Sequence, residues 1–144
     1  IQPSFLANVG SVLNVTGDGT AYTVAFGTEI TDLGSNYNNA TYTFTAPTGG
    51  QYLFATAVGV EGWGAAHTRV RLRILTSNRS YVSDFSDLGL LTTVTNGFGK
   101  TLSVVADMDG NDTASVNLTC EGSTLTVDLE ANAQFNFFSG TLIN

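Results

Sequence analysis

The sequence predicts an all-β domain, folded as a sandwich or a barrel of roughly ten short strands. No segment of useful length repeats its apolar residues with the period of an α-helix. Turn-forming residues recur about every 8–12 positions, and Thr, Val and Phe, which favour strands, are prominent between them. No short sequence repeat is visible, which argues against a propeller or a β-helix.

The clearest unit is the segment 41–58, which has the pattern of a strand, a sharp turn and a second strand. Tyr42 and Phe44 alternate with threonines, as in a strand with one buried face. Pro47 lacks a backbone donor and the glycines Gly49 and Gly50 accept positive φ angles, so strand pairing has to stop there. A second strand rich in aromatic residues follows at once.

The other elements follow from the same rules. Strands are expected at residues 4–9, 22–26, 41–45, 51–60, 68–75, 80–85, 91–94, 101–106, 114–120, 124–129 and 134–143. A turn is expected at 17–19, a long polar loop at 27–39, a loop at 84–89 and a polar turn at 107–112. The whole chain, residues 1–144, is expected to form one domain with a single core.

Two of these strands, 51–60 and 134–143, are apolar on both faces. One face of each sheet meets water in a lone sandwich, so such a strand needs a cover on its second face. We therefore expect part of this apolar surface to lie in an oligomer interface. The aromatic residues expected in the core or in that interface are Phe5, Tyr52, Phe54, Phe135, Phe137 and Phe138.

The chain carries a net charge of −7, and only 12% of its residues are charged. This acidity argues against binding to a nucleic-acid backbone, and no apolar run is long enough to insert into a membrane. Arg69, Arg71 and Arg73 share one face of a strand because they are two residues apart. They either pair with acidic neighbours on a solvated face, or contact an anion, a sugar acid or a partner subunit.

Catalytic residues are scarce, and we expect no enzyme. His67 is the only histidine, and no nucleophile motif of the form G-x-S-x-G occurs. One histidine and one cysteine, Cys120, cannot fill a zinc site, and Cys120 is expected to be a small buried residue. A carbohydrate-cleaving enzyme would need two carboxylates on facing strands, for example Glu61 with Glu130.

Two kinds of ligand contact remain open. Oxygen-bearing side chains gather in the turn 107–112, which either binds calcium or forms an ordinary polar hairpin tip. The calcium candidates are Asp107, Asp109, Asn111 and Asp112, and no other cofactor is expected. Trp63 and Tyr37 are either anchors in the core or an interface, or exposed aromatic surfaces that contact a sugar or a receptor.

Three motifs follow one another along nearly the whole chain. They are Ser4-Phe5-Leu6-Ala7 near the start, Phe44-Thr45-Ala46-Pro47 with Gly50, Tyr52 and Phe54 in the middle, and Phe138-Ser139-Gly140 near the end. Together they make the chain resemble the complement C1q and tumour necrosis factor-like jelly-roll heads, specifically the C1q-like branch in its bacterial or phage form. One stretch departs from that pattern, because residues 110–116 carry an insertion where the family usually has G-D-x-V.

This resemblance implies a ten-stranded jelly roll of two antiparallel sheets that packs as a homotrimer. Such heads usually cap a fibre and bind a receptor or a glycan, which implies an extracellular or virion-surface location and an upstream stalk. Some of them hold calcium near the apex of the trimer. The alternatives are a purely structural trimerisation cap without a ligand and, less favoured, a secreted soluble recognition protein. The chain begins with Ile1, so we expect a processed chain or part of a longer protein.

Overall fold

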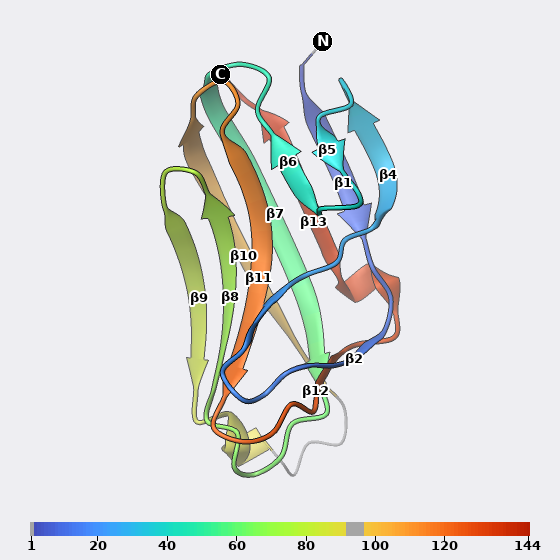
Figure 1. Cartoon of the computed structure of the whole chain (residues 1–144), viewed down its shortest axis with the longest axis vertical. Coiled ribbons are helices and arrows are strands. Elements are labelled where there is room, and N and C mark those ends of the chain that lie inside the picture. Colours follow the sequence, from blue (N-terminus) through green and yellow to red (C-terminus); the bar gives the residue numbers. More distant parts are fainter. Residues whose placement is uncertain (1, 92–96) are drawn as a thin grey trace.

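The computed structural model describes residues 2–91 and 97–144 as a sandwich of two antiparallel β-sheets (Figure 1). The all-β prediction is confirmed, and the architecture is the sandwich rather than the barrel. Within these residues the strands are β1 (Ser4–Asn8), β2 (Val12–Thr16), β3 (Ala21–Thr23), β4 (Thr28–Leu33), β5 (Tyr37–Asn38), β6 (Thr43–Thr45), β7 (Gly50–Glu61), β8 (Arg69–Thr76), β9 (Ser80–Ser86), β10 (Phe98–Met108), β11 (Thr113–Glu121), β12 (Val127–Leu129) and β13 (Phe137–Leu142). Two short 3₁₀ helices, η1 (Leu88–Leu91) and η2 (Ala133–Phe135), complete the described elements.

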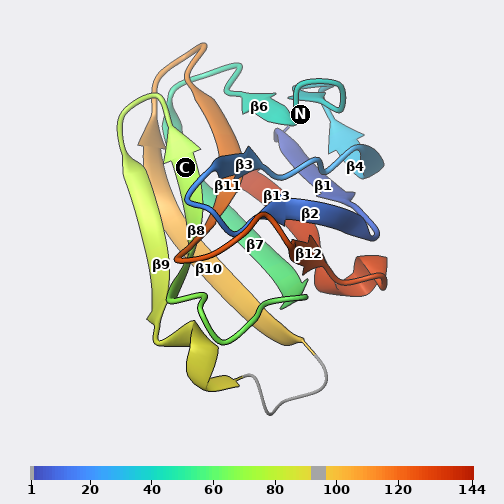
Figure 2. The ribbon, with the colours of Figure 1, turned by 60° about the horizontal axis from the view of Figure 1, so that its bottom comes forward.

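The first sheet, called sheet A here, has the strand order β2-β12-β7-β13-β1-β4, with β10 on the other side of β7. The second, sheet B, has the order β5-β6-β11-β8-β9, and the short β3 also pairs with β11. Figure 2 shows β7 and β10 of sheet A crossing behind β8 and β9 of sheet B. Neighbours in each sheet are mostly distant in sequence, so the two sheets form only when the two halves of the chain come together.

The core lies between the sheets and is centred on stacked aromatic rings. Phe5 stacks on Tyr37 at 4.7 Å between ring centroids and meets Phe138 edge-on at 4.9 Å. Phe44 and Phe54 extend this cluster, because Phe44 stacks on Phe5 and meets Phe54 edge-on. Alternate residues of β1, β7 and β13 supply Phe5, Phe54 and Phe138, because successive side chains of a strand point to opposite faces. The short strands β5 and β6 supply Tyr37 and Phe44.

The predicted polar loop at 27–39 is wrong, because it contains β4 and β5. β4 pairs with β1 through a β-bulge at Leu6 and Ala7 and forms the edge of sheet A. Its side chains are mostly exposed, so no buried alternation marks it as a strand in the sequence. The strand predicted from residue 41 begins only at Thr43, because Tyr42 has a φ angle of 60°, outside the strand region.

Other boundaries also differ from the prediction. The continuous strand expected at 134–143 is divided into η2 and β13, and the strand at 124–129 is reduced to β12. The strands expected at 22–26 and 101–106 correspond to β3 and to the longer β10. The strand expected at 91–94 begins in η1 and otherwise lies outside the described residues. The described residues form thirteen strands rather than ten, because several are pieces of two to five residues.

No helix in the described part of the chain is long and apolar enough to cross a membrane.

Candidate functional site

Most of the predicted aromatic residues lie in the core. Phe5, Tyr52, Phe54 and Phe138 are buried between the two sheets. Tyr37 is also buried, and its hydroxyl donates a hydrogen bond of 2.8 Å to the backbone oxygen of Phe26. Burial raises the pKa of the Tyr37 hydroxyl far above its usual range. The structure therefore favours the core-anchor interpretation of Tyr37 over the exposed aromatic surface.

Phe135 and Phe137 differ from the other aromatic residues because neither belongs to the buried cluster between the sheets. Phe137 is partly buried on the outer face of sheet A, opposite Asn8 of β1 and Ala57 of β7. Phe135 ends η2 and has half of its surface exposed. Asn136 lies between η2, which contains Phe135, and β13, which begins with Phe137. Its buried side-chain amide donates hydrogen bonds to the backbone oxygens of Val9 and Glu130, and these contacts hold the chain at the break between the two elements.

The outer face of sheet A is unusually poor in charge. The register places no charged side chain on this face of β1, of β13, of β7 from Gln51 to Gly59, or of β10 from Gly99 to Val105. Leu53 and Val105 are paired across β7 and β10, and their side chains are 40% and 51% exposed. In a chain with a net charge of −7, this uncharged part of the sheet face is the surface that most resembles an interface.

An open apolar depression continues this face toward β4. Its volume is about 370 Å³, and its lining residues are Leu6, Asn8, Ile30, Ala133, Gln134 and Phe137. Ile30 is more than half exposed at the edge of the sheet. The uncharged face therefore extends from β10 across the sheet to β4, and it contains both raised apolar side chains and a hollow.

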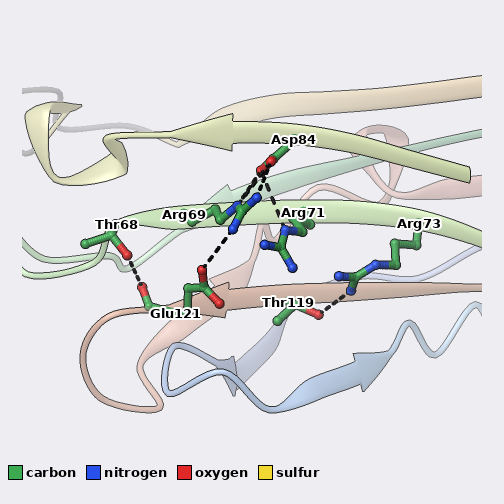
Figure 3. Close-up of polar contacts among 7 residues, drawn as sticks. All are labelled: Thr68, Arg69, Arg71, Arg73, Asp84, Thr119 and Glu121. Atoms are coloured by element: carbon green, nitrogen blue, oxygen red, sulfur yellow. Dashed lines mark hydrogen bonds and ion pairs between the residues drawn. The ribbon is translucent and has the colours of Figure 1, made fainter.

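The outer face of sheet B carries the charged residues. Arg69 contacts Asp84 of β9 through Nε and Nη2 at 2.9–3.2 Å, and its Nη1 lies 3.6 Å from a carboxylate oxygen of Glu121 in β11 (Figure 3). The hydrogen bonds from Arg69 hold the pKa of the Asp84 carboxyl below its usual value. Pairing with acidic neighbours is thus the right interpretation for Arg69.

Arg71 and Arg73 are less completely paired than Arg69. The Nε of Arg71 is 3.9 Å from Asp84 Oδ1, too far for a hydrogen bond. Arg73 Nη1 donates to the hydroxyl of Thr119 at 2.9 Å. For Arg71 and Arg73 both alternatives of the sequence analysis therefore stay open.

Trp63 is partly buried and packs against the core rather than standing clear of it. Its ring meets Phe98 edge-on at 5.1 Å, and Phe98 in turn lies 5.7 Å from Phe85. The indole Nε1 is buried and has no hydrogen-bond partner within the described residues. The structure favours the anchor interpretation of Trp63 over the exposed aromatic surface.

The acidic turn at 107–112 is held by hydrogen bonds and one ion pair. Asp112 Oδ2 accepts from the backbone N–H of Asp109 at 2.8 Å and from the amide of Asn78 at 3.0 Å. Asp107 forms an ion pair of 3.0 Å with Arg79, and Asn111 adopts a φ angle of 74°. No group of three acidic, His or Cys side chains suited to a metal occurs among residues 2–91 and 97–144. Calcium binding at this turn stays a prediction.

His67 has a structural environment. It is 2% exposed, its Nδ1 accepts from the backbone N–H of Gly64 at 2.7 Å, and Nε2 lies 2.9 Å from the backbone oxygen of Thr124. Because Nδ1 is an acceptor, Nε2 must carry the proton. Both ring nitrogens therefore bridge two loops, and neither is available as a general base.

The two carboxylates that a carbohydrate-cleaving enzyme would need are not found together in the three cavities lined by residues 2–91 and 97–144. Glu61 lies opposite Asp128 in the pairing of β7 with β12, and the backbone N–H of Glu130 donates to Gly59. Three cavities lined by described residues contain a single carboxylate between them, that of Asp87. Glu61 and Glu130 line none of these three.

Lys100 is an internal residue that sequence reasoning missed. It lies opposite Val58 on the inward side of β10 and is 9% exposed. Loss of hydration lowers the pKa of its amine. The alternation of residues along β10 could have predicted the inward position of Lys100, but only if the expected strand had been extended back from residue 101 to Phe98.

Cys120 is buried as predicted, and its burial leads to a testable pH dependence. Burial raises the pKa of the Cys120 thiol to about 11. The unfolded chain releases this proton near its ordinary pKa of about 8.5, so the folded state loses relative stability between about pH 8.5 and 11. The loss should approach about 2–3 kcal/mol, and urea unfolding at pH 8 and pH 10.5 measures it.

The Cys120→Ala variant is the control for that measurement. Tyr37 also destabilises the fold at alkaline pH, whereas Lys100 acts in the opposite direction, and both remain in the variant. The variant should therefore lose less stability than the natural chain over the same pH range. An equal loss in both proteins would show that the thiol is not the source.

Comparisons with known proteins show the fold. No family model matches the sequence, and no curated protein matches it. The structure is similar to the globular domain of the zebrafish complement 1qA protein, with a TM-score of 0.61 and 14% identity over 100% of this chain and 98% of that chain. It is also similar to murine APRIL, with a TM-score of 0.65 and 10% identity over 99% and 100% of the two chains. A third similar structure is Eiger TNF from S. frugiperda, with a TM-score of 0.63 and 13% identity over 100% and 92%. The chain therefore has a C1q/TNF-like jelly-roll fold.

Proposed function

We propose that this chain is the trimerising head of an extracellular or virion-surface protein that binds a receptor or a glycan and is joined to a fibrous stalk. The observation that carries the proposal is the uncharged outer face of sheet A. The fold supports it, because the resemblance found in the motifs implies a homotrimer. The scarcity of catalytic groups also favours recognition over an enzymatic role.

The composition of the uncharged face suits close packing between subunits. Leu53 and Val105 provide apolar area, while Ala55, Ala57 and Ser139 beside them are small enough to let a second backbone approach. Apolar surface contributes about 25 cal/mol per Å² removed from water. We therefore assign this face to subunit contacts and sheet B to recognition.

The mass of the purified chain in solution tests the proposal. Light scattering at micromolar concentration should give three times the chain mass of 15.1 kDa. The same mass is expected with calcium and with chelator, because hydrogen bonds and an ion pair already engage the carboxylates of Asp107 and Asp112. A monomer in both conditions would contradict the proposal, and a trimer only with calcium would assign a metal to the turn.

A second candidate is a structural cap that organises trimers and binds nothing. Three of the five predicted ligand contacts favour it, because Tyr37 is in the core, Trp63 packs against the core, and Arg69 is engaged by Asp84 and Glu121. The two candidates give the same mass in solution. They differ in whether the outer face of sheet B takes a ligand.

A further inference from the structure

We propose that Arg71 and Arg73, on the outer face of β8, form a binding site for the carboxylate of an acidic sugar. This inference deepens the recognition role proposed above by assigning it a surface and a class of ligand. The site consists of two guanidinium groups above a sheet face that carries hydroxyl groups, and Figure 3 shows both side chains leaning from β8 toward β11. Four observations support it.

The nearest acid is already occupied by another arginine. Arg69 reaches both carboxylate oxygens of Asp84 at 2.9–3.2 Å, whereas Arg71 lies 3.9 Å from one of them. Arg71 forms no hydrogen bond with the described residues, although its guanidinium has five N–H donors. Its side chain is only 24% exposed, so the strand surface limits how far it can move.

The positive charge of Arg73 is likewise not neutralised. Its one hydrogen bond within the described residues is to the neutral hydroxyl of Thr119. The residues opposite it in register are Asn117 of β11 and Val82 of β9, neither of them charged. Of the two acidic neighbours of the stripe, Glu121 lies opposite Arg69 and Asp84 lies opposite Arg71, and neither lies opposite Arg73.

The spacing suits a single small anion. Residues two apart on a strand lie about 6.5–7 Å apart and point to the same side. A carboxylate between two such guanidinium groups can accept from both, and paired N–H donors match its two oxygens. A long polyanion fits poorly, because the chain carries a net charge of −7 and the surface offers only this one pair.

The surroundings suit a sugar. Ser115 of β11 and Thr23 of β3 share this face of the sheet with the arginines, and their hydroxyls can donate to or accept from sugar hydroxyls. Asn117 lies on the same face, but its Oδ1 is buried and without a hydrogen-bond partner among the described residues, so this oxygen is not exposed to a ligand. The site is open rather than enclosed, so one copy should bind weakly and a trimer should gain from presenting three.

Titration with glucuronic acid and glucose tests the site, because these sugars differ mainly in the carboxylate. Chemical shifts of β8 and β11 amides should move with glucuronic acid and not with glucose, and the affinity should fall as salt rises. The Arg71→Gln and Arg73→Gln variants should each lower the affinity about tenfold or more. Arg79→Gln is the matched control, because it removes the same charge at a distant ion pair and should leave the affinity unchanged.

Two further variants test the competition for Asp84. Asp84→Asn removes the acid nearest to Arg71 and should strengthen binding of glucuronic acid severalfold, by removing a repulsion from the site. Arg69→Gln releases Asp84 to pair with Arg71 and should weaken it. Because only a folded protein can gain affinity, unfolding cannot produce the result expected for Asp84→Asn.

Several outcomes would overturn the inference. Equal responses to glucuronic acid and glucose would exclude a carboxylate site, and acetate binding as tightly as glucuronic acid would exclude a sugar site. Unchanged affinity in both arginine variants would place any binding elsewhere. A trimer that fails these tests refutes only the inference, whereas a monomer that passes them refutes only the trimeric part of the proposed function.

Discussion

Replacing Phe138 with alanine is expected to destabilise the fold by about 3–5 kcal/mol, the usual cost of removing a fully buried ring. Phe138 meets Phe5 edge-on at 4.9 Å and lies 6.0 Å from both Phe26 and Phe54, and it has no exposed surface. Its removal opens a cavity where β1, β7 and β13 meet. Urea unfolding followed by circular dichroism would measure the shift of the midpoint.

Phe135→Ala is the matched control, since it removes the same ring three positions away. Phe135 is half exposed at the end of η2, so its replacement should cost less than about 1 kcal/mol. A similar cost for both variants would mean that Phe135 is buried in solution, for example by another subunit. The same comparison in the isolated monomer would then separate burial within the chain from burial between chains.

Gly140 explains why the motif Phe138-Ser139-Gly140 could be recognised in the sequence. A Cβ atom at Gly140 would lie 2.6 Å from the ring of Phe5 and 2.7 Å from that of Phe54. Only glycine leaves room for both rings against the inner side of β13. The motif is therefore a packing constraint that links three strands, and this is why it identifies the fold and says nothing about a ligand.

The sequence predicted the central strands well because their core positions alternate with more exposed ones. β1, β8 and β11 lie close to their expected positions. Their buried residues follow the period of two, apart from the consecutive buried residues 118–120 near the end of β11. β4 was missed because it is an edge strand with mostly exposed side chains, and it carries no comparable signal. η2 was missed because the break depends on the buried amide of Asn136, which is a tertiary contact.

The site was predictable only in part. The spacing of Arg69, Arg71 and Arg73 placed them on one face, and the structure confirms that placement. Which of the three is neutralised depends on Asp84 and Glu121. The strand register places Asp84 opposite Arg71 and Glu121 opposite Arg69, and the side-chain contacts bring both acids to Arg69. The sequence left two interpretations of Tyr37 open because this residue follows polar residues, and the structure favours the core anchor because the ring of Tyr37 stacks on Phe5.

Leu53→Asp should convert the proposed trimer to a monomer of one third the mass while leaving the fold intact. Leu53 lies on the outer face of β7, between Thr141 of β13 and Val105 of β10, with no basic side chain on the adjoining face to pair with a new carboxylate. Burying an unpaired charge in a subunit interface costs several kcal/mol for each copy. In the monomer the same aspartate would face water, because the Leu53 side chain is 40% exposed there.

Val82→Asp is the matched control for this last change. Val82 is 48% exposed on the outer face of sheet B. Val82→Asp therefore replaces an exposed apolar residue by aspartate, as Leu53→Asp does, but on the opposite side of the sandwich. Light scattering should show a trimer for Val82→Asp and a monomer for Leu53→Asp, with the same circular dichroism spectrum for both. Trimers in both variants would remove the uncharged face from the interface, whereas dissociation only in Val82→Asp would move the interface to sheet B. The latter outcome would also conflict with an open arginine site there, because Val82 lies directly opposite Arg73.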